Sequence, residues 1–141
     1  MTAVKRKMHY FLLFLLLGYL FGLSGCAAEV PENCSMDLES VMTAIEQTGQ
    51  LPDCYITKEE ARKLGWKPSE GNLHEVAPGK AIGGDVFHNR EGKLPDAPGR
   101  IWYEADLNYK GGHRGPERIV FSNDGLIYVT RDHYQTFERL K

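Results

Sequence analysis

The sequence predicts an α+β domain in which N-terminal helices pack on a C-terminal antiparallel β-sheet. Apolar residues recur at helical spacing between residues 35 and 48, and they alternate at strand spacing between residues 100 and 108. Asn123-Asp124-Gly125 separates two further strand-like runs, as hairpin turns do. Helices followed by hairpin-linked strands are typical of α+β domains. The 141 residues, of which 42% are hydrophobic and 26% charged, suffice for one such domain behind a removable N-terminal segment.

The N-terminal segment has the features of an export signal. Three basic residues at positions 5–7 precede an apolar run over residues 10–23, which is short for a membrane span and suits a signal peptide. The run ends in Leu23-Ser24-Gly25-Cys26, which resembles the lipobox of bacterial lipoproteins. We therefore expect a signal peptide over residues 1–25 and a lipid on Cys26 as the only attachment to a membrane. The alternatives are cleavage near Ala27 or Ala28, which releases a secreted protein, and retention of the apolar run as a membrane anchor.

The remaining cysteines suit an oxidising compartment. Residues 26–33 form a short tether in this interpretation, and residues 34–141 form the folded domain. With Cys26 carrying the lipid, Cys34 and Cys54 remain, and a disulfide between them would close a loop of about twenty residues. Two free thiols are the alternative.

The charge distribution excludes a strong general affinity for nucleic acid. The formal net charge is −2, and residues 26–141 carry 14 basic and 19 acidic side chains. Residues 64–141 are balanced, with eleven of each sign. Because the whole domain is acidic, any site for a polyanion must be a local cluster of basic residues in this later part of the chain.

Three helices are expected. The first runs from about Ser35 or Asp37 to residue 48 and ends before Gly49. Thr57-Lys58-Glu59-Glu60 has the pattern of a capping box, which would begin a second helix. Lys58 then lies at the first helical position, where its charge opposes the helix dipole. Asn72 is expected to cap a third, short helix over residues 73–77.

Strands follow over residues 81–87, 100–108, 118–122 and 126–130, and residues 135–140 supply an edge strand. The Gly83-Gly84 pair in the first of them indicates a bulge or a close backbone approach. Along residues 100–108, Glu104 and Asp106 fall on the face opposite Ala105 and Leu107. One face is thus apolar and the other carries two carboxylates.

Several phrases occur in one order along the chain, among them Val76-Ala77-Pro78-Gly79-Lys80, Asn89-Arg90-Glu91-Gly92-Lys93-Leu94-Pro95 and Asp132-His133-Tyr134-Gln135-Thr136-Phe137. With these phrases the chain, from about Leu51 to its C-terminus, resembles the guanyl-specific microbial ribonucleases of the barnase and binase type. The resemblance implies a barnase-like ribonuclease fold for residues 34–141.

The same resemblance implies a catalytic apparatus that needs no metal and no other cofactor. Glu104 matches the family's general base and His133 its general acid, which together convert RNA to a 2′,3′-cyclic phosphate and then hydrolyse it. Lys58, Arg114 and Arg118 match the cations that bind the phosphate. The histidines and cysteines show no zinc-ligand spacing.

The resemblance also implies a loop that recognises guanine. The residues assigned to base binding or stacking are Phe87, His88, Asn89, Arg90, Glu91 and Tyr134. Asp85 and Asp106 are implied to pair with the cations of the site. His88 stands where the family usually has serine, so the strictness of guanine preference stays open.

We therefore expect an exported, metal-independent endoribonuclease that cleaves single-stranded RNA, preferentially after guanosine. It would be a monomer, either a cell-envelope lipoprotein or a secreted protein. If the enzyme serves as a toxin rather than a scavenging nuclease, it needs a barstar-like intracellular inhibitor; the sequence does not separate these roles. The alternative is a non-catalytic surface module of the same fold that binds RNA or protein.

Overall fold

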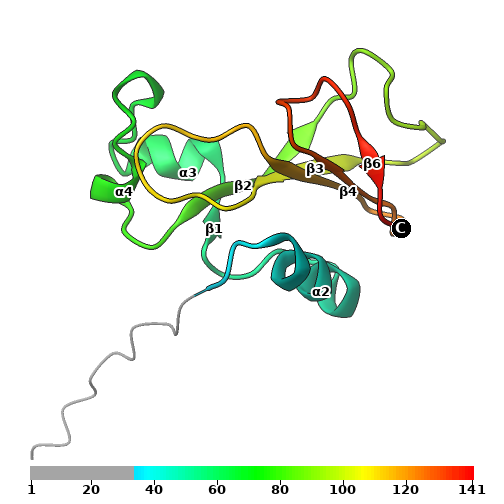
Figure 1. The fold of residues 1–141 in the computed structure, drawn as a ribbon, viewed down its shortest axis with the longest axis horizontal. Coiled ribbons are helices and arrows are strands. Elements are labelled where there is room, and N and C mark those ends of the chain that lie inside the picture. The colour runs from blue at the N-terminus through cyan, green and yellow to red at the C-terminus, as the bar shows by residue number, and fades with distance from the viewer. Residues whose placement is uncertain (1–33) are drawn as a thin grey trace, which may run out of the picture. The chain divides into compact units, whose positions relative to one another are not determined.

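A computed structural model describes residues 34–141 (Figure 1). The predicted signal peptide, the lipobox with Cys26 and the tether lie outside the described residues. Among residues 34–141, no helix has the length and apolar character that crossing a bilayer requires. The helices are α2 (Leu38–Thr48), α3 (Lys58–Lys63), the 3₁₀ helix η1 (Pro68–Glu70) and α4 (Leu73–Val76). The strands are β1 (Tyr55–Ile56), β2 (Ala81–Phe87), β3 (Trp102–Asp106), β4 (Arg118–Ser122), β5 (Ile127–Thr130) and β6 (Glu138–Arg139).

The six strands form one sheet in the order β1-β2-β3-β4-β5-β6. Strands β2 to β6 are antiparallel neighbours, which confirms the predicted α+β class. The predicted antiparallel sheet carries one further strand at its edge, where β1 pairs parallel with β2 through Tyr55 and Ala81. A two-residue strand is too short to show an alternating pattern, and its partner lies beyond three helices in the chain.

Helix α2 packs on one face of this sheet and forms the main core. Asp37 caps the helix by accepting a hydrogen bond from the Ser40 amide at 2.9 Å, and Gly49 ends it with a φ of 72°. Val41 and Ile45 are buried against the sheet. The sheet residues of this core are Ala105, Leu107, Ile119, Phe121, Ile127 and Val129. The predicted amphipathic helix and the apolar face of residues 100–108 are thus confirmed.

The start of α3 agrees with half of the predicted capping box. The Thr57 hydroxyl accepts from the Glu60 amide at 3.2 Å. The Glu60 carboxylate accepts from the Thr57 hydroxyl, not from its amide. Asn72 is the N-cap residue of α4 as predicted, but its side chain makes no capping hydrogen bond and instead accepts from the Lys67 amide and donates to the Gly65 carbonyl. Asn72 therefore holds the turn after α3 together, which sequence spacing alone did not indicate.

The Gly83-Gly84 pair forms the predicted bulge in β2. The register with β3 shifts between Gly83 and Asp85, and Gly84 has a φ of 98°. A Cβ on Gly83 would lie 2.5 Å from Tyr55 Cδ1 and 2.8 Å from the Ala105 Cβ, so only glycine fits there. Beyond the bulge, Asp85 pairs with Glu104 on β3. The bulge thus sets which β2 residues lie beside the carboxylates of β3.

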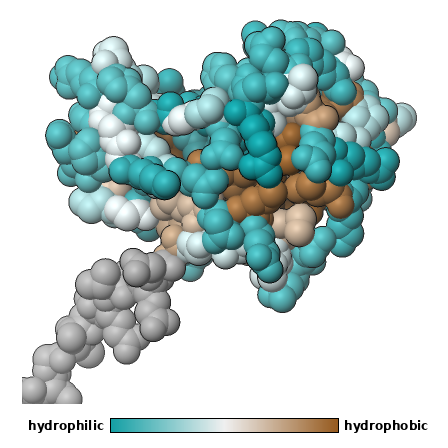
Figure 2. Space-filling model, viewed as in Figure 1, coloured by the Kyte–Doolittle hydropathy of each residue, from teal (hydrophilic) through white to brown (hydrophobic). Residues whose placement is uncertain are grey.

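Cys34 and Cys54 are joined by a disulfide, with their Cα atoms 5.8 Å apart. Cys54 is buried, and its carbonyl accepts from the Ala81 amide at 3.0 Å. The bond links the segment before α2 to the turn before β1. Figure 2 shows one face of the molecule, on which hydrophilic residues surround an apolar area near the middle.

Candidate active site

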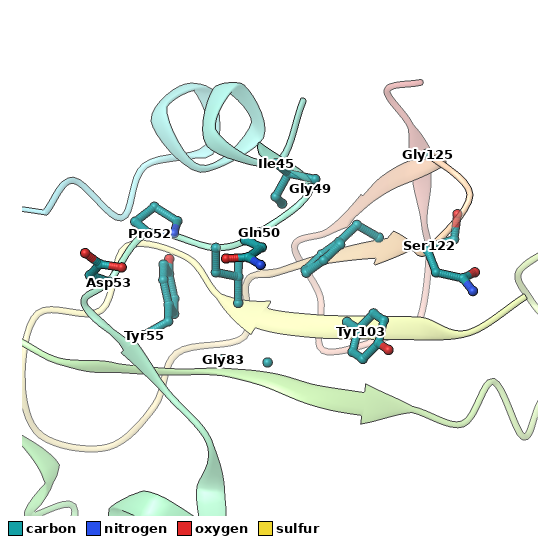
Figure 3. Close-up of a pocket in the computed structure, with 14 residues that line it drawn as sticks. Ile45, Gly49, Gln50, Pro52, Asp53, Tyr55, Gly83, Tyr103, Ser122 and Gly125 are labelled. Atoms are coloured by element: carbon teal, nitrogen blue, oxygen red, sulfur yellow. The ribbon is translucent and has the colours of Figure 1, made fainter. Parts of the chain in front are cut away.

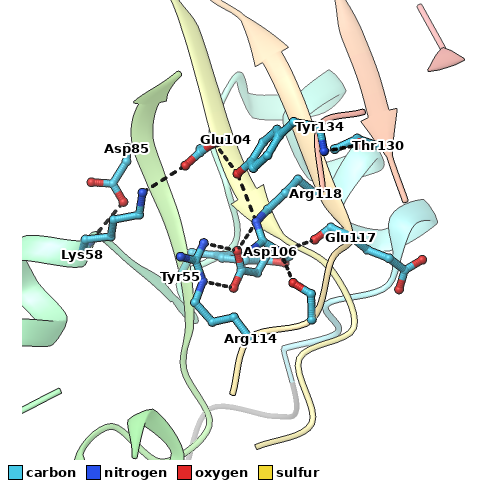
Figure 4. A network of polar contacts seen from close by, with 11 residues as sticks. Tyr55, Lys58, Asp85, Glu104, Asp106, Arg114, Glu117, Arg118, Thr130 and Tyr134 are labelled. Atoms are coloured by element: carbon cyan, nitrogen blue, oxygen red, sulfur yellow. Dashed lines mark hydrogen bonds and ion pairs between the residues drawn. The ribbon is translucent and has the colours of Figure 1, made fainter. Parts of the chain in front are cut away.

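Strand β3 places two carboxylates on the face of the sheet opposite α2. Glu104 is 7% exposed and Asp106 is 2% exposed, whereas the intervening Ala105 faces the α2 core. Side chains alternate along a strand, so the two acids lie next to each other on one face. Buried carboxylates must be paired with donors or cations to be stable. Each of them has such partners (Figure 4).

Asp106 pairs with both arginines of the predicted site. Arg114 binds it in a two-point contact, with Nε 2.7 Å from Oδ2 and Nη2 2.6 Å from Oδ1. Arg118 Nε lies 3.0 Å from Oδ1, and the Arg118 side chain is almost fully buried. Burial lowers the pKa of Arg114, but the hydrogen bonds and charge of Asp106 more than offset this and raise it. Two guanidiniums around one carboxylate leave this part of the site with a local positive charge.

Glu104 is held by one cation and one neutral donor. Lys58 Nζ lies 3.2 Å from Oε1, and the Tyr134 hydroxyl donates to Oε2 at 2.7 Å (Figure 4). The same hydroxyl accepts from Arg118 Nε at 3.2 Å. Burial, and then the hydrogen bond to Glu104, raise the pKa of Tyr134, so its hydroxyl stays protonated and serves as a donor. Tyr134 therefore connects Glu104 to the arginine pair, a contact that the sequence analysis did not include.

Asp85 contacts Lys58 differently from the expectation. Its carboxylate accepts from the Lys58 backbone amide at 3.0 Å, and Lys58 Nζ binds Glu104 instead (Figure 4). The expectation that Asp85 pairs with a cationic side chain of the site was therefore wrong. The contact fixes the first residue of α3, from which the Lys58 side chain extends to Glu104.

His133 lies in an unusual loop over residues 131–136, which we name the acid loop. Both His133 and Tyr134 have positive φ values, 54° and 67°, which are uncommon for residues other than glycine. The His133 amide donates to the Pro116 carbonyl, and the Tyr134 amide donates to Thr130 Oγ1. Such strained residues persist only where their surroundings hold them, and they concentrate at functional sites.

Asp132 supplies much of that support. Its carboxylate accepts from the amide and hydroxyl of Thr136 and from the Thr130 hydroxyl. The Thr136 side-chain hydrogen bond, and then its amide, lower the pKa of Asp132 to about 2. The ring centroids of His133 and Tyr134 are 5.0 Å apart. His133 is exposed and lies next to Tyr134, whose hydroxyl contacts Glu104.

The residues predicted to bind the base line one cavity of about 390 Å³ together with Glu104 and Lys58. From residues 87–94, which we name the base loop, the cavity is lined by Phe87, His88, Asn89, Arg90, Glu91 and Lys93. Tyr134, Val86 and Phe137 complete it. The Phe87 and Tyr134 rings stack, with centroids 5.4 Å apart and planes inclined by 13°. The base loop and Glu104 therefore line one cavity.

Asn89 uses its side chain to shape the base loop. Its Nδ2 donates to the Leu94 carbonyl at 2.8 Å, and its Oδ1 accepts from the Leu94 amide at 3.0 Å. Its backbone has a φ of 49°, and its carbonyl accepts from the Gly92 amide. Because the amide side chain is buried and satisfied, it is the backbone of this residue that remains for a ligand.

Sequence reasoning missed Lys93, Phe137 and Asp132. Phe137 packs near Phe87 with ring centroids 6.0 Å apart, and Lys93 contacts the acid loop. The only available signal was that each lies within a phrase of the family resemblance. No local pattern indicates a contact between segments about forty residues apart.

A second cavity, of about 650 Å³, lies on the α2 side of the sheet (Figure 3). Its lining includes Ile45, Tyr103 and Phe121, which belong to or pack against the main core. None of the predicted catalytic or base-binding residues lines it. Among residues 34–141, no three histidine, cysteine or acidic side chains gather as metal ligands do.

Comparison with known proteins gives a consistent family assignment. A family model for ribonucleases matches residues 39–141. A ribonuclease from Heyndrickxia coagulans is 63% identical over 92 residues, which cover 65% of this chain and 84% of the relative. A ribonuclease from Bacillus intermedius is 63% identical over 92 residues, which make up only 57% of its length. Guanyl-specific ribonuclease St from Saccharopolyspora erythraea is 40% identical over 55 residues, 38% of this chain and 54% of the relative. The chain therefore belongs to the ribonuclease family of the barnase and binase type.

Proposed function

We propose that this protein is an exported, metal-independent endoribonuclease that cleaves single-stranded RNA after guanosine. The observation that supports this most is the shared cavity, in which the base loop lies beside Glu104 and Lys58. The Asp106 network, with Arg114 and Arg118, adjoins it through Tyr134. The proposed base-binding residues and the proposed general base thus line the same cavity.

The proposed reaction begins at the 2′-hydroxyl of the guanosine. Glu104 takes its proton, the 2′-oxygen attacks phosphorus, and the bond to the 5′-oxygen breaks as His133 donates a proton to that oxygen. The product is a 2′,3′-cyclic phosphate. In the second step the roles exchange, because His133 removes a proton from water and Glu104 protonates the 2′-oxygen that leaves. Protons are therefore conserved over the whole cycle.

The cations act on the phosphate oxygens, where negative charge grows in the transition state. Fixed guanidiniums and ammonium groups stabilise that charge more than they stabilise the bound substrate. Asp106 holds Arg114 and Arg118 in place, so they need little reorganisation when the charge develops. Tyr134 donates to the Glu104 carboxylate and orients it towards the cavity.

Guanine recognition is assigned to the base loop. Guanine offers O6 and N7 as acceptors, and N1–H and N2–H₂ as donors. The backbone amides near Asn89 and Arg90 would serve the acceptors, and the exposed Glu91 carboxylate would serve the donors. Adenine presents the opposite pattern at the six-membered ring and would leave these groups unpaired. The similarity to guanyl-specific ribonuclease St supports the same preference.

Export is proposed from the N-terminal sequence. A lipid on Cys26 would make the protein a cell-envelope lipoprotein, and cleavage beyond it would make a secreted enzyme. Replacing Cys26 by serine should abolish labelling with a lipid precursor if the first form is correct.

An intracellular inhibitor would present an acidic surface to Lys58, Arg114, Arg118 and His133. We propose that the enzyme acts as a monomer.

The decisive experiment is digestion of short oligonucleotides by the purified protein in EDTA, followed by identification of the cut sites. We expect cuts after guanosine, and 2′,3′-cyclic ends early in the reaction. Glu104→Gln and His133→Ala should each lower kcat/KM by about 10²–10⁴-fold while the protein stays folded. Activity that disappears with chelation, or cuts spread evenly over the four bases, would contradict the proposal. Binding of RNA without any cleavage would favour the non-catalytic alternative.

A further inference from the structure

The Lys93 ammonium lies between the base loop and the acid loop. Lys93 Nζ donates to the carbonyl oxygens of Tyr134 at 3.1 Å and of Gln135 at 2.9 Å, and it lies 3.2 Å from Glu91 Oε2. The ammonium thus donates two hydrogen bonds to the acid loop and forms an ion pair with the base loop. Across the described residues 34–141, these are the hydrogen bonds that join the base loop to the acid loop.

The base loop does not need Lys93 for its own shape. Asn89 closes the loop through its two hydrogen bonds to Leu94, and the Gly92 amide completes a turn with the Asn89 carbonyl. Apart from Lys93, the loops touch through the stacked rings of Phe87 and Tyr134. A stack of two rings permits sliding, because dispersion and apolar contact are not directional. The directional contacts between the loops are those of Lys93.

The acid loop does need support from outside. Its residues His133 and Tyr134 both have positive φ, and the two carbonyls that accept from Lys93 belong to Tyr134 and Gln135. Lys93 therefore binds the backbone immediately after His133. At the same time its ammonium forms an ion pair with Glu91, the carboxylate assigned to guanine N1–H and N2–H₂.

We propose that Lys93 is a positioning residue that couples guanine recognition to proton donation. It holds the Glu91 carboxylate and the backbone that carries His133 at one fixed separation, so that a guanine bound at Glu91 brings its 3′-phosphate to the imidazole. This inference rests on the proposed function. Lys93 lines the cavity beside Glu91, and its proposed role acts through the Glu91 carboxylate and the backbone of the acid loop.

The test compares Lys93→Met, which keeps the length of the side chain without donors, with Lys93→Arg, which keeps charge and donors. In Lys93→Met, the two carbonyls that lose the ammonium can bind water at the surface, so this variant should fold. The probes are the dinucleoside phosphates GpC and ApC, and 3′-GMP for binding measured by calorimetry. Lys67→Met is the matched control, because Lys67 pairs with Glu70 at 3.7 Å and does not line the cavity.

We expect Lys93→Met to lower kcat/KM for GpC by roughly tenfold, since about 1.4 kcal/mol of lost interaction corresponds to that factor. The preference for GpC over ApC should fall, 3′-GMP should bind more weakly, and kcat should fall with both substrates because His133 is displaced. Lys93→Arg should restore most of the preference and of kcat. Lys67→Met should match the wild type in kcat and in the preference for GpC over ApC.

Two outcomes would overturn the inference. A Lys93→Met protein that keeps the wild-type preference for GpC over ApC, with only a lower Tm, would reduce Lys93 to a stabilising residue. A Lys93→Arg protein as impaired as Lys93→Met would show that donors at this position do not position the loops. The wild type tests the proposed function separately, because equal cleavage of GpC and ApC by the unaltered protein would refute guanine recognition itself.

Discussion

The two faces of strand β3 differ in the kind of contact that each makes. Ala105 and Leu107 face α2 in a cluster whose contacts are apolar and non-directional. Glu104 and Asp106 face the active site, where each oxygen has an identified donor at 2.6 to 3.2 Å. The residues on the apolar face of the strand thus stabilise the fold, and those on the polar face form the proposed active site. We infer that substitutions on the apolar face cost stability, and those on the polar face cost activity as well.

Among the substitutions that compare the two faces of β3, the largest effect is expected at Asp106. Asp106→Asn keeps the size of the side chain but leaves Arg114 and Arg118 close together without their anion. Breaking a buried ion pair costs about 3–5 kcal/mol of unfolding free energy. Loss of the fixed guanidiniums should lower kcat/KM by about 10²–10³-fold. Urea unfolding and oligonucleotide cleavage measure the two quantities, and the exposed Asp53→Asn serves as control. Full activity in Asp106→Asn would remove the distinction between the faces.

Ile119 offers the opposite test, because it follows Arg118 directly and is buried in the α2 core. Ile119→Ala should lower the unfolding free energy by about 2–5 kcal/mol through lost contacts and a residual cavity. At a temperature where the variant is folded, kcat/KM should remain that of the wild type. A large loss of activity in folded Ile119→Ala would show that the two faces are mechanically coupled.

The disulfide sharpens the comparison, since it fastens the segment before α2 to the sheet without touching the active site. A cross-link between residues 20 apart stabilises by about 3 kcal/mol in the chain-entropy account. Cys34→Ala/Cys54→Ala should therefore lower Tm and leave the cleavage pattern unchanged. Calorimetry with and without dithiothreitol measures the same difference on the natural chain. An unchanged Tm in both experiments would show that the bond contributes nothing.

The smallest effect is expected at Asp132, which is exposed. Its pKa is lowered from 3.8 to about 2 by Thr136, so its carboxylate is favoured in the folded state. The stabilisation is complete above about pH 4 and is lost as pH falls through 2. Removal of the hydroxyl in Thr136→Val should move the pKa of Asp132 back towards 3.8. An NMR titration of the carboxyl groups measures the shift, and an identical titration in both proteins would exclude the Thr136 hydroxyl as a cause.

Local pattern predicted much of the fold. The apolar spacing in α2, the alternation along β3 and the turn at Asn123-Asp124-Gly125 each depend on neighbours in the chain, and each prediction was confirmed. The parallel β1 edge was missed because it has two residues and a partner beyond three helices. The side-chain partners of Asn72 were missed because the Lys67 amide and the Gly65 carbonyl precede it in a turn.

The sequence by itself determined the residue types of the site and the strand face on which Glu104 and Asp106 lie, because a period of two follows from backbone geometry. The tertiary structure decided which group pairs with which. Asp106 binds two arginines, Asp85 binds an amide, and Tyr134 donates to Glu104 30 residues away. Hydrogen bonds act only within about 3 Å, so their partners depend on how distant segments are brought together and not on spacing along the chain.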